Sequence, residues 1–260
     1  MSPKWTDAVG YESYVGRWSR VIAPSFLQWL AVPAGARWLD VGCGTGALTN
    51  AIIGEAQPSS LSCVDSSAPY LAHATAGRWD ERVTFDTGDA TALPYSDRAF
   101  DAVVSGLLLN FVDADASVAE QRRVVRDKGL VGAYVWDYAG EYELVRYFWD
   151  SAAEVDPAAA AHDPGLRFPL CEPHALAALF RRHGLRNIST TRLIGMASFA
   201  NFLEYWQTLD VRQGSLAEYL SAIDATTRGA IRSRLEEAVP RRPSGGLQLK
   251  LSAVAVVGSR

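Results

Sequence analysis

The chain has 260 residues, of which 48% are hydrophobic and 21% are charged, and 25 basic against 29 acidic residues give a net charge of −4. This composition excludes an intrinsically disordered chain, and the mild acidity argues against a protein whose main task is to bind nucleic acid. No apolar run reaches the roughly 18 residues that a membrane span requires, and residues 1–11 lack the apolar segment of a secretory signal. We therefore expect a single cytoplasmic domain over residues 1–260, and the sequence makes no prediction of oligomeric state.

The cysteines and histidines indicate neither a disulfide framework nor a metal site. Cys43, Cys63 and Cys171 form no C-x-x-C pair, and the four histidines share no metal-ligand spacing. Tryptophans are more informative, because each buries a large apolar area and can either fill a core or wall an apolar cavity. Six of them lie outside the glycine-rich region: Trp5, Trp18, Trp29, Trp136, Trp149 and Trp206.

The first half of the chain alternates short apolar runs with amphipathic segments. Residues 11–31 predict two helices that break near Pro24, since proline disfavours the helical region for the residue before it. The strands expected next are 37–41, 61–64, 83–85, 100–104 and 130–136, and the helices between them are 46–56, 68–78 and 114–126. This alternation predicts an α/β fold with a parallel sheet and helices on both faces.

The alternation ends after Asp137. Residues 138–170 contain an alanine run, three prolines and many aromatics, and they predict an insertion rather than another strand–helix unit. The remaining expected elements are a helix over 172–183 with Gly184 as its C-cap, a sixth strand over 186–194, helices within 197–239, and a final antiparallel strand over 247–257.

The strongest chemical signal is the segment Asp40-Val41-Gly42-Cys43-Gly44-Thr45-Gly46, in which a buried strand ends in three alternate glycines before a helix begins. Glycines let the backbone approach a ligand closely, and a helix N-terminus presents free N–H groups. We therefore expect a cofactor at the carboxyl end of the first strand. Gly42, Gly44 and Ala47 also satisfy a loose dinucleotide fingerprint, so this loop alone leaves the cofactor open.

Two acidic residues follow the next two strands. Asp65 ends the second strand and is followed by Ser66, and its two oxygens can accept both hydroxyls of a ribose. Asp89 follows the third strand, where it can accept a hydrogen bond from an adenine amino group with the Ala90 backbone beside the ring. A loop that binds adenosine flat across three strand ends needs such a residue, whereas a dehydrogenase does not.

Together, Asp40 to Gly46, Asp65 and Gly88-Asp89-Ala90-x-x-Leu93-Pro94 resemble the class I S-adenosylmethionine-dependent methyltransferases, in particular the type 11 group that includes ubiquinone/menaquinone-type enzymes. The resemblance covers residues 10–137 well and 185–257 more weakly. It implies a Rossmann-like, doubly wound seven-stranded sheet of order 3-2-1-4-5-7-6 whose last strand is antiparallel.

The resemblance also implies S-adenosyl-L-methionine as the cofactor, with its ribose at Asp65, its adenine amine at Asp89 and its methionine part at the glycine loop. Arg17, in the N-terminal helix, is a candidate partner for the cofactor carboxylate. The complete set of cofactor-binding candidates is Tyr14, Arg17, Asp40, Gly42, Cys43, Gly44, Asp65, Ser66, Asp89, Ala90 and Leu107.

The catalytic base is not assigned by the sequence. Relatives often carry a histidine after the fourth strand, but here Asn110 stands at that place in Leu107-Leu108-Leu109-Asn110-Phe111. The candidates just past the fifth strand are Asp137 and Tyr138.

These observations favour methyl transfer to a small, partly apolar acceptor, with no nucleic acid partner and no membrane span. The segments 11–31, 138–170 and 196–243 are expected to form helical lid insertions that enclose this acceptor. Two alternatives stay open: a non-catalytic S-adenosylmethionine-binding protein, because no base is evident, and a nicotinamide-dependent oxidoreductase. Asp40, Gly46 and Asp89 count against the second alternative.

Overall fold

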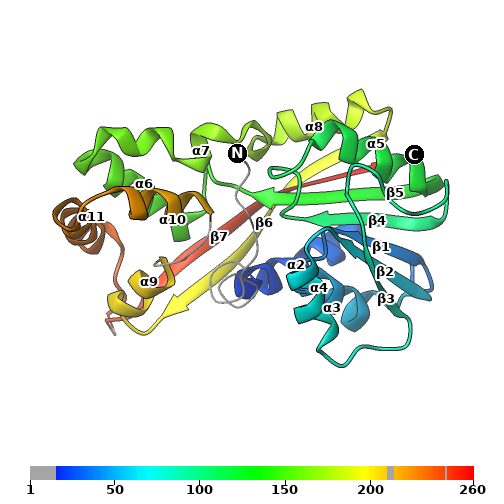
Figure 1. Cartoon of the computed structure of the whole chain (residues 1–260), viewed down its shortest axis with the longest axis horizontal. Coiled ribbons are helices and arrows are strands. Elements are labelled where there is room, and N and C mark those ends of the chain that lie inside the picture. Colours follow the sequence, from blue (N-terminus) through cyan, green and yellow to red (C-terminus); the bar gives the residue numbers. More distant parts are fainter. Residues whose placement is uncertain (1–15, 210–213, 244) are drawn as a thin grey trace.

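The computed structural model describes residues 16–209, 214–243 and 245–260, and Figure 1 shows their arrangement around one sheet. The strands are β1 (Arg37–Val41), β2 (Ser60–Asp65), β3 (Val83–Thr87), β4 (Phe100–Gly106), β5 (Val125–Trp136), β6 (Arg186–Phe199) and β7 (Leu247–Ser259). Their order is β3-β2-β1-β4-β5-β7-β6. Strands β1 to β5 pair in parallel, and β7 is antiparallel to both β5 and β6. The predicted doubly wound, Rossmann-like sheet and its strand order are confirmed.

Helices cover both faces of the sheet because the strands alternate their side chains between two apolar layers. Trp38 on β1 packs in the layer under α2 (Arg17–Leu30), α3 (Ala47–Ala51) and α4 (Ala68–Thr75). Its neighbour Leu39 packs in the opposite layer, under α5 (Ala114–Val124) and α8 (Pro173–Arg182). Both side chains are buried, so β1 is covered on both sides as a central parallel strand should be.

The predicted break at Pro24 is wrong, because α2 runs continuously through this residue. An interior proline costs a helix about 3 kcal/mol. Against this cost stands the burial of the stripe around Ile22 and Phe26, both fully buried. The Phe26 ring lies edge-on to Tyr134 of β5, with 4.9 Å between the ring centroids. Packing against the sheet therefore overrides the local preference to end the helix.

Two strands exceed their predicted bounds by five residues each, more than the other strands do. β5 begins at Val125 instead of residue 130. β6 continues to Phe199, so residues 197–199, which were expected to be helical, are in a strand. In this stretch Ala197 pairs with Leu249 and Phe199 pairs with Leu247 of β7. The pairing with a partner strand decides this segment, since its apolar residues also fit helical spacing.

The expected helix over 46–56 and the expected insertion over 138–170 are both present, but each is divided into shorter elements. The helix consists of α3 followed by a π-helical turn over Ile52–Ala56. The insertion contains α6 (Glu143–Val155), α7 (Pro164–Arg167) and two short 3-10 turns. Within 197–239 the helices are α9 (Phe202–Leu209), α10 (Gly214–Ala222) and α11 (Ala225–Ala238).

Helices α6, α9, α10 and α11 form a helical group at the far ends of β6 and β7 (Figure 1). Its interior is aromatic: Trp149 lies 5.2 Å from Phe148 and 5.6 Å from Tyr219 between ring centroids. The Tyr205 hydroxyl donates to the carbonyl of Leu144 at 2.9 Å, which joins α9 to α6. Among the described residues, no helix combines the length and the apolar character needed to cross a bilayer.

We predict that Trp149→Ala lowers the free energy of unfolding by about 3–5 kcal/mol, the cost of truncating a large buried aromatic. The side chain is 2% exposed and contacts Phe148 and Tyr219, so its loss leaves a cavity. Urea denaturation measures the change. Leu203→Ala on α9 is the control, because this side chain is 50% exposed and should matter by less than about 0.5 kcal/mol. Unchanged stability in Trp149→Ala would contradict a core role for this ring.

Candidate functional site

The loop after β1 requires glycine at more than one position. Gly42, Gly44 and Gly46 have φ angles of +70°, +56° and +89°, which other residues rarely adopt. At Gly42 a Cβ atom would lie 2.8 Å from the side chain of Leu108, and at Gly46 it would lie 2.9 Å from the ring of Trp79. Any side chain at these two positions would therefore both strain the backbone and displace a neighbour.

Asp65 ties this loop to the end of β2. One carboxylate oxygen accepts a hydrogen bond from the N–H of Gly44 at 2.8 Å, and the other accepts one from the N–H of Ser67 at 2.8 Å. Burial raises the pKa of the Asp65 carboxyl, and the backbone hydrogen bonds oppose this effect. A carboxylate has about four lone-pair sites, so it retains capacity for a ligand.

A cavity of about 280 Å³ opens at the carboxyl ends of four strands. It is lined by Gly42 and Gly44 after β1, Asp65, Ser66 and Ser67 at β2, Gly106, Leu107 and Leu108 after β4, Trp136 and Tyr138 at β5, and by Tyr70, Phe111 and Val112. A smaller cavity of about 50 Å³ shares Gly42, Asp65, Ser66, Leu108 and Val112 and extends to Gly88, Asp89 and Ala90. The two cavities form one cleft over the strand ends, as expected for this type of sheet.

Asp89 lies at the outer end of this cleft and is exposed. Its Oδ1 atom accepts hydrogen bonds from both the N–H and the hydroxyl of Thr91, each at 2.8 Å. These bonds lower the pKa of the Asp89 carboxyl, so it is ionised at neutral pH and acts as an acceptor only.

The cleft brings together most of the residues singled out in the sequence. Gly42, Gly44, Asp65, Ser66, Asp89, Ala90, Leu107 and Tyr138 all line it. Cys43 and Asp40 are buried within and behind the glycine loop. Tyr14 lies outside the described residues.

Two expected site residues are used elsewhere. The guanidinium carbon of Arg17 lies 3.9 Å from the ring centroid of Trp18, and Arg17 does not line the cleft. Asp137 is 1% exposed and accepts hydrogen bonds at Oδ2 from Arg192 Nε at 3.1 Å and from the hydroxyl of Ser252 at 3.0 Å. Asp137 thus joins β5 to β6 and β7, which the sequence position just past a strand did not reveal.

Several lining residues escaped the sequence analysis, among them Tyr70, Phe111 and Val112. They come from α4 and from the segment after β4, where no polar motif marks them. Trp136 belonged to the six tryptophans considered, and it is the only described one of these that lines the cleft. Its ring stacks on Tyr142, with 4.3 Å between centroids and 5° between planes.

Asp40 carries a buried carboxyl beneath the cleft. The hydroxyl of Thr49 donates to its Oδ2 at 2.7 Å, while Oδ1 has no hydrogen-bond partner among the described residues. Burial raises the pKa of Asp40 to about 7, and the nearby charge of Asp65 adds to this rise.

We predict a pH effect on stability at Asp40. Its folded pKa of about 7 lies above the usual value near 3.8, so the folded state binds the proton more tightly. The resulting stabilisation is complete below about pH 4 and is lost as the pH rises through 7, by a few kcal/mol in total. Urea denaturation at pH 5 and pH 8 measures this effect. Between these two pH values, Asp40→Asn should lose less free energy of unfolding than the wild type does.

Asp127→Asn is the control for this measurement, because that side chain is 70% exposed. It should keep the pH dependence of the wild type. If Asp40→Asn and the wild type lose the same free energy of unfolding between pH 5 and pH 8, the raised pKa assigned to Asp40 is wrong.

Comparisons with known proteins place this cleft in a family. Residues 39–129 match the family model described as a methyltransferase domain. The demethylmenaquinone methyltransferase of Roseiflexus castenholzii is 29% identical over 185 residues, which are 65% of this chain and 76% of that protein. The malonyl-[acyl-carrier protein] O-methyltransferase of Geobacter sulfurreducens is 40% identical over 103 residues, which are 36% of each chain.

Among solved structures, the YcgJ protein of Bacillus subtilis superposes with a TM-score of 0.58 at 17% identity, over 92% of this chain and 97% of that one. This likeness shows the fold. The matched segment 39–129 contains the glycine loop, Asp65 and Asp89, all of which line or support the cleft. Residues 39–129 are therefore a methyltransferase domain, similar to the type 11 branch of the class I S-adenosylmethionine-dependent methyltransferases, and the cofactor is S-adenosyl-L-methionine.

Proposed function

We propose that this enzyme methylates a small, partly apolar organic acceptor that binds in the larger cavity. The observation that carries the proposal is the apolar part of the cavity lining, which includes Leu107, Leu108, Phe111 and Trp136. The volume of about 280 Å³ lies at the lower end of the range for small-molecule pockets, and the acceptor shares it with part of the cofactor.

The residues present fit the cofactor. Asp65 would hold the ribose hydroxyls with its remaining lone pairs. Both described hydrogen bonds to Asp89 end on Oδ1, so Oδ2 is placed to accept from the adenine amine. Gly42 and Gly44 leave the backbone open beside the methionine part. The cofactor supplies a methyl group on a positively charged sulfur, and the protein's task is to align the acceptor and exclude water.

Of the two catalytic candidates, we assign a role to Tyr138 alone. It lines the larger cavity, whereas Asp137 is engaged by Arg192 and Ser252. The Tyr138 ring packs 5.9 Å from Phe168 between centroids, and Phe168 in turn lies 5.4 Å from Phe111. We infer that these three rings form the wall that closes over the acceptor.

The proposal keeps only a part of the lid expected from 11–31, 138–170 and 196–243. Among the described residues of these segments, Tyr138 lines the cavity and Phe168 supports it. Trp149 and Trp206 are buried in the helical group, where Trp206 lies 5.9 Å from the guanidinium carbons of Arg228 and Arg232. We therefore place neither tryptophan in the acceptor site.

The relatives support a small acceptor without fixing which one. The Roseiflexus enzyme is named for demethylmenaquinone, while the Geobacter enzyme is named for a malonyl group on a carrier protein. The three free, buried cysteines are compatible with a reducing, cytoplasmic location, which is part of the proposal.

We predict that Asp65→Ala weakens the binding of S-adenosylhomocysteine by about 10- to 150-fold, which corresponds to about 1.5–3 kcal/mol for hydrogen bonds to a charged group. The loss combines the ribose contact with the released N–H of Gly44. Isothermal titration calorimetry measures the affinity. Asp115→Ala, which removes a 54% exposed carboxylate on α5, should bind like the wild type. An unchanged affinity in Asp65→Ala would remove this residue from the site.

We predict that Tyr138→Ala raises the KM for the acceptor on the order of tenfold, because an aromatic wall of the cavity is lost, and leaves the KM for S-adenosylmethionine nearly unchanged. The acceptor is first found by following S-adenosylhomocysteine release with a panel of small phenols, quinols, amines and carboxylates. Tyr147→Ala on α6 is the matched control, since Tyr147 does not line the cleft. Cofactor binding without turnover of any acceptor would favour the non-catalytic alternative.

A further inference from the structure

Arg123, near the end of α5, uses every donor of its guanidinium group. Its Nε donates to Glu120 Oε1 at 2.7 Å, and its Nη2 donates to Glu120 Oε2 at 2.7 Å and to the carbonyl of Leu93 at 3.0 Å. Its Nη1 donates to the carbonyl of Tyr95 at 2.7 Å and to Asp97 Oδ1 at 2.9 Å. A guanidinium has five N–H donors, so the group is saturated by one helix residue and one loop segment.

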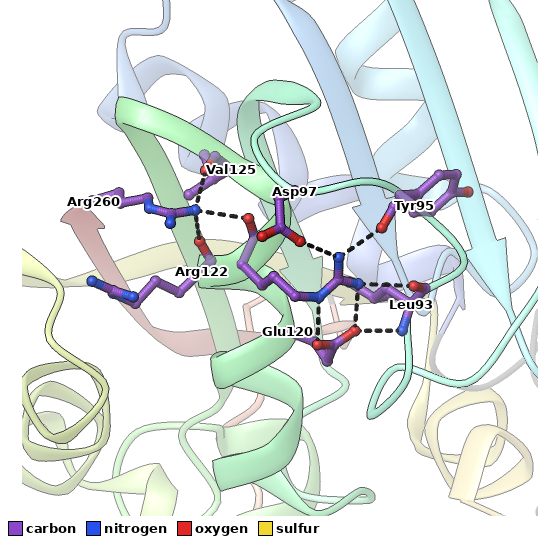
Figure 2. Close-up of polar contacts among 8 residues, drawn as sticks. Leu93, Tyr95, Asp97, Glu120, Arg122, Val125 and Arg260 are labelled. Atoms are coloured by element: carbon purple, nitrogen blue, oxygen red, sulfur yellow. Dashed lines mark hydrogen bonds and ion pairs between the residues drawn. The ribbon is translucent and has the colours of Figure 1, made fainter.

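Glu120 also contacts this loop directly, as a hydrogen-bond acceptor. Its Oε2 also accepts the N–H of Leu93 at 2.8 Å. The pair formed by Arg123 and Glu120 therefore binds both the N–H and the carbonyl of Leu93, as Figure 2 shows for Leu93 and Glu120. The Glu120 side chain is 19% exposed, and a partly buried bidentate pair of this kind is stronger than a surface ion pair.

The same loop, residues 88–97, is also tied to β3. The hydroxyl of Tyr95 donates to Asp86 Oδ2 on β3 at 2.8 Å. A Cβ atom at Gly88 would lie 3.0 Å from Pro94, so the start of the loop lies against its middle. Asp89 and Ala90, at the smaller cavity, lie between Gly88 and Pro94.

The C-terminal turn of α5 is fixed as well. Arg260 Nη1 lies 2.8, 2.7 and 2.9 Å from the carbonyl oxygens of Arg122, Arg123 and Val125 (Figure 2). The last carbonyls of a helix have no partner within it, so this cation satisfies them. The backbone that carries the Arg123 side chain is thereby held in place.

We propose that Arg123 and Glu120 are positioning residues for the cofactor: they fix the segment 88–97 so that Asp89 stands where the adenine amine binds. The proposal rests on the assigned contact between Asp89 and adenine. Neither Arg123 nor Glu120 lines the cleft, so both act through the loop backbone. Asp89 stands out in the sequence, but no local pattern there connects it with a helix about thirty residues later.

The test compares two ligands that differ at the adenine amine. S-adenosylhomocysteine carries the amino group, and its inosine analogue carries an oxygen in its place. Arg123→Lys keeps the charge but loses the planar fork. It should bind S-adenosylhomocysteine about tenfold more weakly and bind the inosine analogue nearly as the wild type does. Equal losses for both ligands would show a general effect on the site and overturn the proposal.

A double-mutant cycle tests the route through Asp89. Asp89→Ala alone should weaken S-adenosylhomocysteine, and adding Arg123→Lys should weaken it little further, because both changes remove the same contact. Fully additive losses would overturn the proposal. So would a loss in Arg123→Lys when Asp89→Ala has no effect, and that outcome would also show that the Asp89 assignment is wrong.

Controls separate this effect from folding and from catalysis. Arg182→Lys on α8 disturbs an ion pair at 2.8 Å with Asp115 of α5, the helix that carries Arg123, and it should leave both affinities unchanged. Glu120→Gln is the second variant if Arg123→Lys does not fold, and it should show the same preference between the ligands. If both variants unfold, the pair serves global stability and the proposal is wrong. Because only binding is measured, the result does not depend on which acceptor is methylated.

Discussion

The hydrogen bond between the Asp65 carboxylate and the N–H of Gly44 holds the glycine loop against the end of β2, where the cleft opens. This hydrogen bond of 2.8 Å joins the loop after β1 to the end of β2, while Leu108 fills the space that a side chain at Gly42 would need. The floor of the cleft is therefore bare backbone and one carboxylate. The two adjacent cavities, the exposed Asp89 and the aromatic wall lie around this floor.

Two neighbouring carboxyls dominate the electrostatics near the glycine loop. Asp40 and Asp65 lie close enough that the charge of Asp65 contributes to the raised pKa of Asp40, and burial raises the pKa of both. Placing two carboxyls in a partly dry site is unfavourable for either anion alone. The raised pKa values shift both groups toward their neutral forms, which lowers the cost of burying them.

The sheet and the helical group differ in what they contribute to the cleft. Residues at the carboxyl ends of β1 to β5 line the cleft. The insertion after β5 adds Tyr138 to this lining, and Phe168 packs against Tyr138, whereas the interior of α6, α9, α10 and α11 is a packed aromatic core. Under the proposed function, acceptor choice depends on these few rings rather than on the whole helical group.

The sequence by itself determined the alternation of strands and helices, the glycine loop, Asp65 and Asp89, because strand periodicity and backbone conformations that require glycine are local properties. Tertiary packing decided the rest. α2 continues through Pro24 because its apolar stripe is buried on the sheet, and Asp137 is structural because Arg192 reaches it from β6. Only the fold distinguishes Trp136 from the buried tryptophans of the helical group, since contacts between distant segments leave no local pattern.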